Sequence, residues 1–543
     1  MRASLLALSA AALGASAHAA DLPTRKSVPV EYMRVCTVYG PGFFYIPGSD
    51  TCIRVGGRAV FEYANGNVFG RTSDVSSFNA TGRLLLDART ATDWGPLRSF
   101  IRIDLSRNSG NAPLGTFGSG GAARGGRAIA FGGGAPVAVT FPAFSGVDTM
   151  GNRLQTGVGV MAYVQWGGLT AGRLQSLFDF YYDNDTWFGI ADSNVLTQVL
   201  AYTYTFGNGF SATLSIEDPK ERQRYPVAGL APVAAGGINP SVATPPFTIT
   251  YPFALSPFSA PFLTPGGISY TQRESVPDVV GVARVDQDWG SAQLSGAYHR
   301  ISTVGGTVVS LTPTNTGAGV VANPLLPSVP GGFGAVTGNG FGVQGGVKIK
   351  MPWVAPGDTL YLEAAYSKGG LAFVDSGFPT SYTGLAYNQG GGTTTATYDA
   401  VVGPTGRVTL TPAWSAMFSY VHYWWPTLRQ GLFAGVVDVK YSGAIRTAAG
   451  FAAGAACPTC LGSVTFANGA VYNPFSIQYN GGEQYNIGTN LIWSPVKNLD
   501  IGVEVFYFRN QLQHRQFDVN RGAGFLISED DAWRFRLRVL RDF

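Results

Sequence analysis

The end of the chain alternates between charged and large apolar side chains. Arg534, Arg536 and Arg538 are separated by single apolar residues, and the sequence closes on Phe543. In a β-strand, such alternation places the two sets of side chains on opposite faces. A soluble sheet buries its apolar face in a core, whereas a membrane barrel turns that face toward lipid and the charged face toward a wet interior. The terminal aromatic residue favours the barrel, because we expect it to lie at the lipid interface.

Composition favours the same class. Charged residues make up 13% of the 543 residues, about half the usual quarter, whereas the 73 glycines are about twice as frequent as in an average protein. Beyond residue 20, no apolar run approaches the ~18 residues that a transmembrane helix needs. These features predict a transmembrane β-barrel, and a glycine-rich soluble β protein is the alternative.

The first residues have the pattern of an export signal. Arg2 precedes an apolar stretch over residues 5–17 and a small-residue cleavage site, so we expect a secretory signal peptide in residues 1–19. Residues 20–52 then form a short periplasmic-side segment, too small for a large plug, and residues 53–543 form the barrel. The formal charge of only +4, without a lysine-rich run, predicts no nucleic-acid partner.

The four cysteines fall into two close pairs. Cys36 and Cys52 flank a turn-rich segment, and an oxidising compartment favours a disulfide there. Cys457 and Cys460 have the spacing of a redox motif, but their stretch is rich in Gly and Ala and has no βαβ pattern or nearby histidine. A loop disulfide is therefore favoured over a redox centre or a metal site. We expect no metal ion and no cofactor.

Aromatic residues mark seven short turns. At each one an aromatic residue ends an alternating run, a turn of the Gly, Pro or Asn type follows, and another alternating run begins. The turns are Trp94–Pro96, Trp166–Gly168, Phe206–Gly209, Trp289–Ser291, Trp353–Gly357, Trp425–Thr427 and Trp493–Asn498. Seven of the ten tryptophans lie at these turns, as in the interfacial girdle of a membrane barrel.

Long connections rich in Gly, Pro, Ser and Thr alternate with the short turns. They cover about 64–76, 108–153, 177–196, 217–275, 303–338, 369–408, 443–482 and 510–530. Eight long loops and seven short turns join sixteen antiparallel strands, with the short turns periplasmic and the long loops external. The strands centre near residues 58, 86, 102, 160, 172, 201, 212, 282, 296, 346, 363, 416, 435, 489, 504 and 536. Sixteen strands make a ring too wide for side chains to fill, so an aqueous channel is expected.

Charged residues of four strands share one face. An arginine that faces lipid at the bilayer midplane costs ~2–4 kcal/mol, so we expect this face to line the lumen. Closure of the barrel makes the last strand the neighbour of the first. The predicted pore-lining basic wall consists of Arg58, Arg83, Arg89, Arg98, Arg102, Arg534, Arg536 and Arg538.

The third long connection, residues 177–196, is aromatic and acidic. Aromatic side chains are costly in a solvated loop unless they pack, so we expect this loop to fold against the inner wall of the barrel. Asp179, Asp183 and Asp185 would then face the arginine wall and select solutes by size, polarity and charge. The alternative is an external loop with solvated carboxylates.

With these features, the chain resembles the general porins of α-proteobacterial outer membranes. The residues that carry the resemblance are Val30–Cys36, Tyr39–Gly48 with its Tyr-Ile-Pro-Gly end, Cys52–Gly57, the third loop and Phe543. The resemblance implies a trimeric, 16-stranded channel in outer-membrane lipid for passive diffusion of ions and small hydrophilic solutes. It also implies the third loop as constriction and Phe543 as the signal for the barrel assembly machinery. The greater length and the Cys457/Cys460 loop depart from the family pattern.

Other functions are less well supported by the sequence. Beyond the signal, His299, His422 and His514 are widely separated, and the chain contains no Gly-Lys dipeptide, so no metalloprotease motif or phosphate-binding loop predicts an enzyme. A substrate-selective channel, for example for sugars, and an adhesin or structural barrel with a blocked lumen remain as alternatives.

Overall fold

The computed structural model describes most of the chain. The described residues are 34–66, 76–109, 154–182, 185–223, 228–229, 268–269, 273, 275–303, 307–308, 313–315, 320–322, 335–375, 385–387, 393–396, 398–402, 407–456, 459–476, 479–518 and 522–543. The expected signal peptide, residues 1–19, lies outside them.

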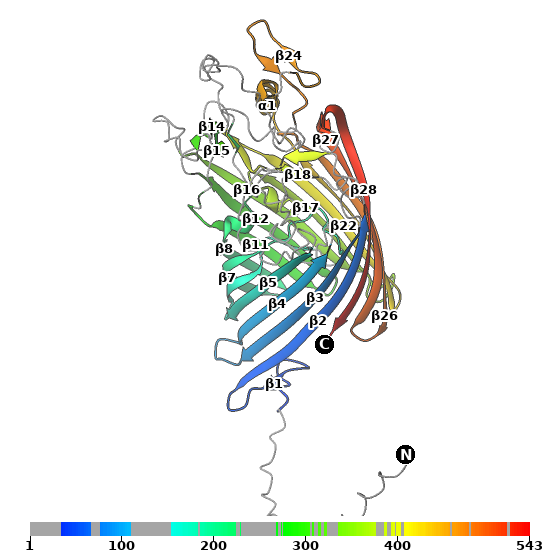
Figure 1. Cartoon of the computed structure of the whole chain (residues 1–543). Helices are drawn as coiled ribbons and strands as arrows, with labels where there is room; N and C mark the ends of the chain where they lie inside the picture. Colours follow the sequence, from blue (N-terminus) through cyan, green and yellow to red (C-terminus); the bar gives the residue numbers. More distant parts are fainter. Residues whose placement is uncertain are drawn as a thin grey trace, which may run out of the picture.

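One closed antiparallel barrel dominates the described part of the chain (Figure 1). Its sheet has 17 strands, of which the two-residue β1 (Phe44–Tyr45) pairs antiparallel with the start of β2 alone, so sixteen form the barrel. They are β2 (Thr51–Gly66), β3 (Ser76–Thr90), β4 (Leu97–Ser109), β5 (Leu154–Trp166), β6 (Leu169–Gln175), β7 (Leu196–Gly207), β8 (Phe210–Glu217), β11 (Asp278–Gln287), β12 (Gly290–Ser302), β16 (Thr337–Lys350), β17 (Thr359–Lys368), β22 (Pro412–Trp425), β23 (Leu428–Val439), β26 (Gly482–Val496), β27 (Leu499–Asp518) and β28 (Gly522–Asp542). Pairing of β28 with β2 closes the ring.

Shorter elements lie in the connections. The helices are η1 (Pro219–Glu221), η3 (Leu371–Phe373) and α1 (Gly443–Ala456). The short strands are β9 (Ala228–Gly229), β10 (Ile268–Ser269), β13 (Thr307–Val308), β14 (Pro313–Asn315), β15 (Val320–Ala322), β18 (Leu385–Tyr387), β19 (Thr394–Ala396), β20 (Ala400–Val402), β21 (Val408–Leu410), β24 (Val464–Thr465) and β25 (Val471–Tyr472).

The predicted strands and short turns are confirmed. Each of the sixteen predicted centres falls within a barrel strand, and each of the seven predicted turns joins two neighbouring strands. Asn208 and Gly209 show the local cause, with φ angles of 50° and 78° between β7 and β8. Two consecutive positive φ angles define the tight hairpin turn that matches the twist of paired strands. Figure 1 places β1 and the C-terminal end of β28 at one end of the barrel and α1 and β24 at the other.

Two predicted loops are wrong in part. The connection expected over 510–530 is mostly strand, because β27 runs to Asp518 and β28 begins at Gly522. Polar residues there continue the hydrogen-bonded hairpin, with register shifts, beyond the predicted end of the strands. The connection expected over 443–482 contains α1, whose alanine-rich sequence has high helix propensity, so the fold is not purely β.

Within the described residues, no helix is both long enough and apolar enough to cross a membrane.

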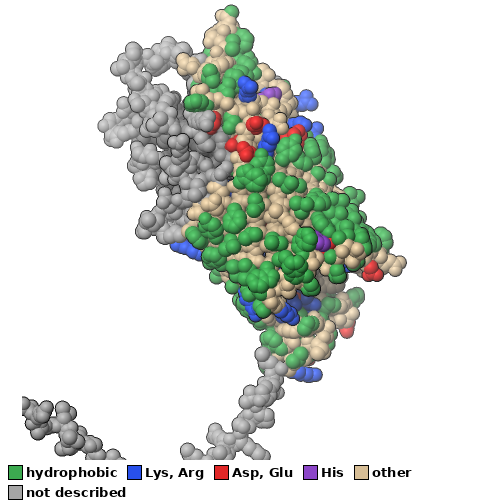
Figure 2. Space-filling view, turned by 90° about the vertical axis from the view of Figure 1, so that its right-hand side faces the viewer, with side chains coloured by type: hydrophobic (Ala, Val, Ile, Leu, Met, Phe, Trp, Pro, Cys, Tyr) green, Lys and Arg blue, Asp and Glu red, His purple; other side chains and the backbone are tan. Residues whose placement is uncertain are grey.

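Large apolar side chains cover the outer face of the barrel. All seven tryptophans at the short turns are exposed, from 42% for Trp166 to 76% for Trp94. Figure 2 shows apolar side chains gathered over the middle of one flank, with charged side chains toward its two ends. Such exposure would be unfavourable in water but suits lipid, and the ring of tryptophans fits a membrane interface.

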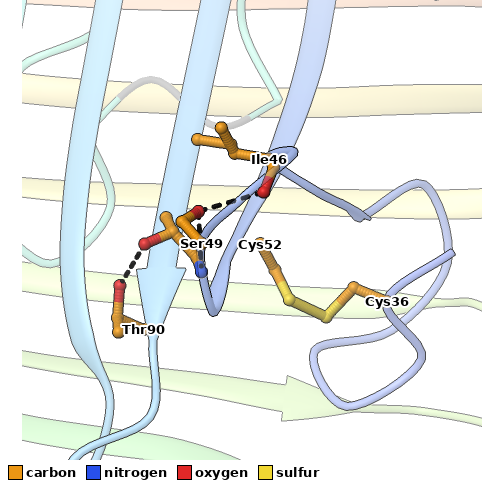
Figure 3. Close-up of a disulfide and its surroundings, with 6 residues drawn as sticks. Cys36, Ile46, Ser49, Cys52 and Thr90 are labelled. Carbon is orange, nitrogen blue, oxygen red and sulfur yellow. Dashed lines mark hydrogen bonds between the residues drawn. A yellow bond between two sulfur atoms is a disulfide. The ribbon is translucent and has the colours of Figure 1, made fainter. Parts of the chain in front are cut away.

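A disulfide secures the segment that precedes the barrel. Cys36 and Cys52 are bonded, as predicted (Figure 3). Both cysteines are buried beside Phe43. The Thr51 and Thr90 hydroxyls hydrogen-bond at 2.8 Å and tie the start of β2 to the end of β3. Cys460 is also disulfide-bonded, whereas Cys457 lies outside the described residues.

Candidate functional site

The alternation of β28 separates its side chains into two faces. Trp533 and Phe535 are 57% and 36% exposed on the outside, whereas Arg534 and Arg536 are 5% and 0% exposed. Arg538 belongs to the same inward set and bonds to Glu62 on β2. The structure therefore directs this row of arginines into the barrel.

Three inward-facing carboxylates, Asp87, Asp104 and Glu62, are each shared by two or three arginines. Asp87 on β3 lies 2.8 Å from Arg89, 2.9 Å from Arg98 and 3.8 Å from Arg54. Its own side chain is only 2% exposed, because the guanidinium groups surround it. The arginines remain partly exposed to the interior, so this part of the wall presents positive charge.

The same arrangement recurs along the neighbouring strands. Asp104 lies 2.6 Å from Arg83 and 3.2 Å from Arg102. Glu62 lies 2.5 Å from Arg538 and 3.4 Å from Arg536. Arg58 pairs with Asp542 at 2.6 Å. All eight arginines of the predicted wall thus lie on β2, β3, β4 and β28, which are consecutive around the barrel.

We call residues 176–195, between β6 and β7, the inner loop. Its Asp179 forms an ion pair of 2.8 Å with Arg222, which follows η1, and both side chains are buried. Asp179 also accepts hydrogen bonds from the Ser193 hydroxyl and the Val195 N–H. Arg222 donates to the carbonyl of Ala372 in η3, so one charge pair joins three separate segments.

Acidic residues of the barrel hold the backbone of the inner loop. Glu217 accepts from the Leu177 N–H, Glu363 from the Tyr181 N–H, and Glu504 from the N–H groups of Trp187 and Phe188. A carboxylate that accepts backbone N–H groups forms charge-assisted bonds, which are about twice as strong as neutral ones. These bonds position the loop along the inner side of β8, β17 and β27.

Aromatic packing fixes the same path. Tyr181 packs against Tyr361 of β17, with ring centres 5.2 Å apart, and Phe188 packs against Phe506 of β27 at 5.6 Å. These side chains belong to one buried cluster with Phe433 of β23. Burial of each such side chain contributes about 1.5–3 kcal/mol, so the apolar contacts stabilise the loop strongly inside the barrel.

The far part of the inner loop reaches the arginines of β28. Arg536 donates to the Trp187 carbonyl at 2.7 Å, and its guanidinium lies 4.0 Å from the centre of the Phe188 ring. The guanidinium of Arg538 lies 4.5 Å from the Trp187 ring. The loop and the wall therefore meet through cation–π contacts and a carbonyl.

The acidic residues of the inner loop that were predicted to face the arginine wall have other surroundings where the structure describes them. Asp179 faces Arg222 instead of the arginine wall, and Asp183 lies outside the described residues. Asp185 is half-buried and accepts a hydrogen bond from Ser419 on β22. Burial raises the pKa of the Asp185 carboxyl, although Ser419 and the more distant Lys348 oppose this effect.

Sequence reasoning did not identify Arg222, Glu363 or Glu504 as partners of the inner loop. Glu363 and Glu504 stand on the inward face of apolar strands, at 5% and 0% exposure. A single carboxylate within an alternating strand is a usable signal, because it needs a donor inside the barrel. The donors that bond Glu363 and Glu504 lie more than a hundred residues away in the chain, so the sequence alone does not predict which residues they are.

Proteins named as porins are similar in sequence to part of the chain. Porin Omp2b of Brucella canis is 31% identical over 256 residues, which cover 44% of this chain and 61% of that protein. Porin Omp2b of Brucella suis is 28% identical over 309 residues, which cover 55% and 66% of the two chains. The chain therefore matches less than two thirds of the length of each of these relatives.

Solved structures of outer-membrane proteins align over most of the chain. The outer membrane channel DcaP of Acinetobacter baumannii has 13% identity and a TM-score of 0.48, covering 92% of this chain and 99% of its own. OmpF of Salmonella typhi, in complex with daunomycin, has 9% identity and a TM-score of 0.40, covering 91% and 98%.

A family model described as the porin subfamily matches residues 21–535. Since this match covers most of the chain, it settles the family independently of the partial relatives. The protein therefore belongs to the porin subfamily of bacterial outer-membrane barrels.

Proposed function

We propose that the protein forms an aqueous channel for passive diffusion of ions and small hydrophilic solutes. The observation that carries this proposal is a closed barrel of sixteen strands with an apolar outer face, and the arginines of β2, β3, β4 and β28 support it. A barrel of this size leaves space that wall side chains do not fill, and charged side chains keep such a space hydrated.

The inner loop is the proposed constriction. Trp187 packs against the wall at Glu504, Arg536 and Arg538, whereas the more exposed arginines of β2, β3 and β4 border the remaining opening. In this proposal Arg58, Arg83, Arg89, Arg98 and Arg102 line the pathway, and Asp179 acts by fixing the loop instead of by meeting solutes. Asp185 is half-buried and accepts a hydrogen bond from Ser419 on β22 instead of facing the exposed arginines.

A passive channel is favoured over a sugar channel that uses a row of lumen aromatics. Phe180, Tyr181, Phe188 and Phe506 are between 0% and 4% exposed, because the inner loop and the wall cover one another. Buried rings offer no surface for a sugar to slide along. The more exposed arginines of β2, β3 and β4 therefore support passive diffusion of hydrated solutes.

The proposed partners are outer-membrane lipid, two further copies of the chain in a homotrimer, and the barrel assembly machinery. Lipid contact is supported by the exposed tryptophans of the short turns. Phe543 is 70% exposed and its backbone pairs with Gly57 on β2, which leaves its ring accessible for recognition. Cross-linking of the purified protein, followed by denaturing electrophoresis, tests the trimer.

Planar-bilayer recording tests the channel. We expect stepwise conductance that rises linearly with salt concentration, whereas saturation by one solute would favour a selective channel. Trp187→Ala should raise the single-channel conductance, since it removes the ring that holds the proposed constriction against Arg538. Trp353→Ala, on an exposed turn tryptophan, is the matched control and should not change it. Folded protein without conductance would contradict the proposal and favour an adhesin or structural barrel.

A further inference from the structure

Arginine outnumbers carboxylate along the inner wall. Within the described residues, Asp87, Asp104 and Glu62 are shared by seven inward-facing arginines. These are Arg54, Arg83, Arg89, Arg98, Arg102, Arg536 and Arg538. Sharing stabilises the arginines but does not neutralise them, so the wall retains a net positive charge.

Two arginines of this wall stand directly opposite each other. Arg58 on β2 is the cross-strand partner of Arg83 on β3. Like charges in this position repel. Each guanidinium turns to its own carboxylate, Arg58 to Asp542 and Arg83 to Asp104, so the carboxylates lie outside the pair. Arg102 approaches Asp104 from the next strand.

The three guanidinium groups keep donors for a ligand. Arg58 and Arg83 each bond their carboxylate through Nε and Nη2, and Arg102 contacts Asp104 through Nε. An arginine has five N–H donors, so several remain on each side chain. The side chains are 35%, 21% and 23% exposed, and they face the interior. A small solute can therefore reach these donors.

The other side of the interior does not offset this charge. Arg284 pairs with Asp286 and Arg429 pairs with Asp500, so each of these pairs is neutral. Glu363 and Glu504 lie under the inner loop and bond its backbone.

Among the described acids of the inner loop, Asp179 and Asp192 are buried and Asp185 is half-buried. Asp179 is neutralised by Arg222, and both side chains are buried. Asp185 is half-buried, and burial raises the pKa of its carboxyl. Within the part of the chain that the structure describes, the exposed charge that a passing solute meets is therefore mostly that of the arginines.

We infer that Arg58, Arg83 and Arg102 form a docking site for small anions that carry a carboxylate or phosphate group, and that this site makes the channel anion-selective. The inference rests on the channel function proposed above and names its substrate class. Guanidinium groups match the planar, paired oxygens of such anions, and a ring of like charge in a pore favours the opposite ion.

Bilayer recording across a potassium chloride gradient tests the selectivity. The reversal potential of the wild-type channel should show that chloride permeates faster than potassium. The double variant Arg58→Gln, Arg102→Gln should shift this potential toward the potassium side, whereas Arg58→Lys, Arg102→Lys should retain the wild-type sign. Arg509→Gln is the control for loss of an arginine away from this site, because Arg509 pairs with Glu529 on an exposed surface.

Inorganic phosphate tests the docking site in the same channels. Added to one side, phosphate should reduce the chloride current through the wild type and the Arg509→Gln control, and should reduce it at least several-fold less in the double glutamine variant. Equal block in all variants, or a wild-type channel that prefers potassium, would overturn the inference. A complete lack of conductance would instead count against the proposed channel function, so the two failures are distinguishable.

Discussion

The guanidinium of Arg222 lies 2.8 Å from the carboxylate of Asp179, and the two side chains are 1% and 0% exposed. This pair joins the inner loop to the segment after β8 and, through the Ala372 carbonyl, to η3. Because it connects three segments, this ion pair is the main polar contact that holds the part of the inner loop around Asp179.

Arg222→Met should therefore destabilise the protein. Removal of one partner leaves Asp179 buried without its counter-charge, which costs about 3–5 kcal/mol. We expect this loss in urea unfolding of the protein in detergent, together with noisier single-channel currents, because the loop is held less firmly. The double variant Arg222→Met, Asp179→Leu should recover part of the stability. An unchanged unfolding midpoint for Arg222→Met would contradict this role.

Asp185 should make stability depend on pH. Burial raises its pKa in the folded protein above the value of an unfolded chain. Between these two pKa values the folded state binds more protons, so this residue's contribution to stability falls as the pH rises through that interval. Asp185→Asn should thus be more stable than the wild type at neutral pH, and the difference should vanish below the unfolded pKa. Urea titrations at several pH values measure this, and Asp286→Asn, at a wall carboxylate that pairs with Arg284, serves as a comparison.

The disulfide should stabilise the protein without affecting the pore. Cys36 and Cys52 close a loop with a sequence separation of 16, and a loop of this length is worth about 3 kcal/mol. Replacement of both cysteines by serine should lower stability by about that amount. Single-channel conductance should remain unchanged, since the bond joins the preceding segment to the first residues of β2, at the end of the barrel. A changed conductance would show that the segment reaches the pathway.

The tryptophans of the short turns should lie at the headgroup level of one membrane face. All seven are exposed on the outside of the barrel, whereas Trp187 is buried within it. Lipids brominated near the headgroup should therefore quench the fluorescence more strongly than lipids brominated near the chain end. Trp187→Phe should leave the quenched fraction almost intact, while replacing the turn tryptophans should remove most of it. Stronger quenching from the chain end would argue against the girdle.

Much of the barrel could be predicted because strand alternation and turn residues act locally. The side-chain period of two assigns Arg536 inward and Phe535 outward without knowledge of any partner, and Asn208-Gly209 specifies a hairpin by its own φ angles. The region near 510–530 was mispredicted because polar residues look like a loop, although their backbone still pairs with the adjacent strand.

The inner loop could be predicted as a packed segment but not in its contacts. Its aromatic residues indicate burial, yet the choice between Arg222 and the wall as partner of Asp179 depends on tertiary distance. The same limit applies to Glu504, which bonds residues more than three hundred positions away. The position of a charged residue in an alternating strand predicts which face of the barrel it occupies. Its bonding partner depends on the tertiary fold.

The seam between β2 and β28 has a consequence for assembly. Arg58 bonds to Asp542 across a sequence separation of 484 residues, and Gly57 exchanges backbone hydrogen bonds with Phe543. Contacts of this range form late and slowly, since the intervening chain must first be brought together. Until they form, two strand edges are open, and in hydrocarbon each unpaired backbone group costs several kcal/mol. The incomplete sheet therefore has two unpaired edges that must be kept from the hydrocarbon. Pairing of β28 with β2 satisfies both edges and completes the ring in the bilayer.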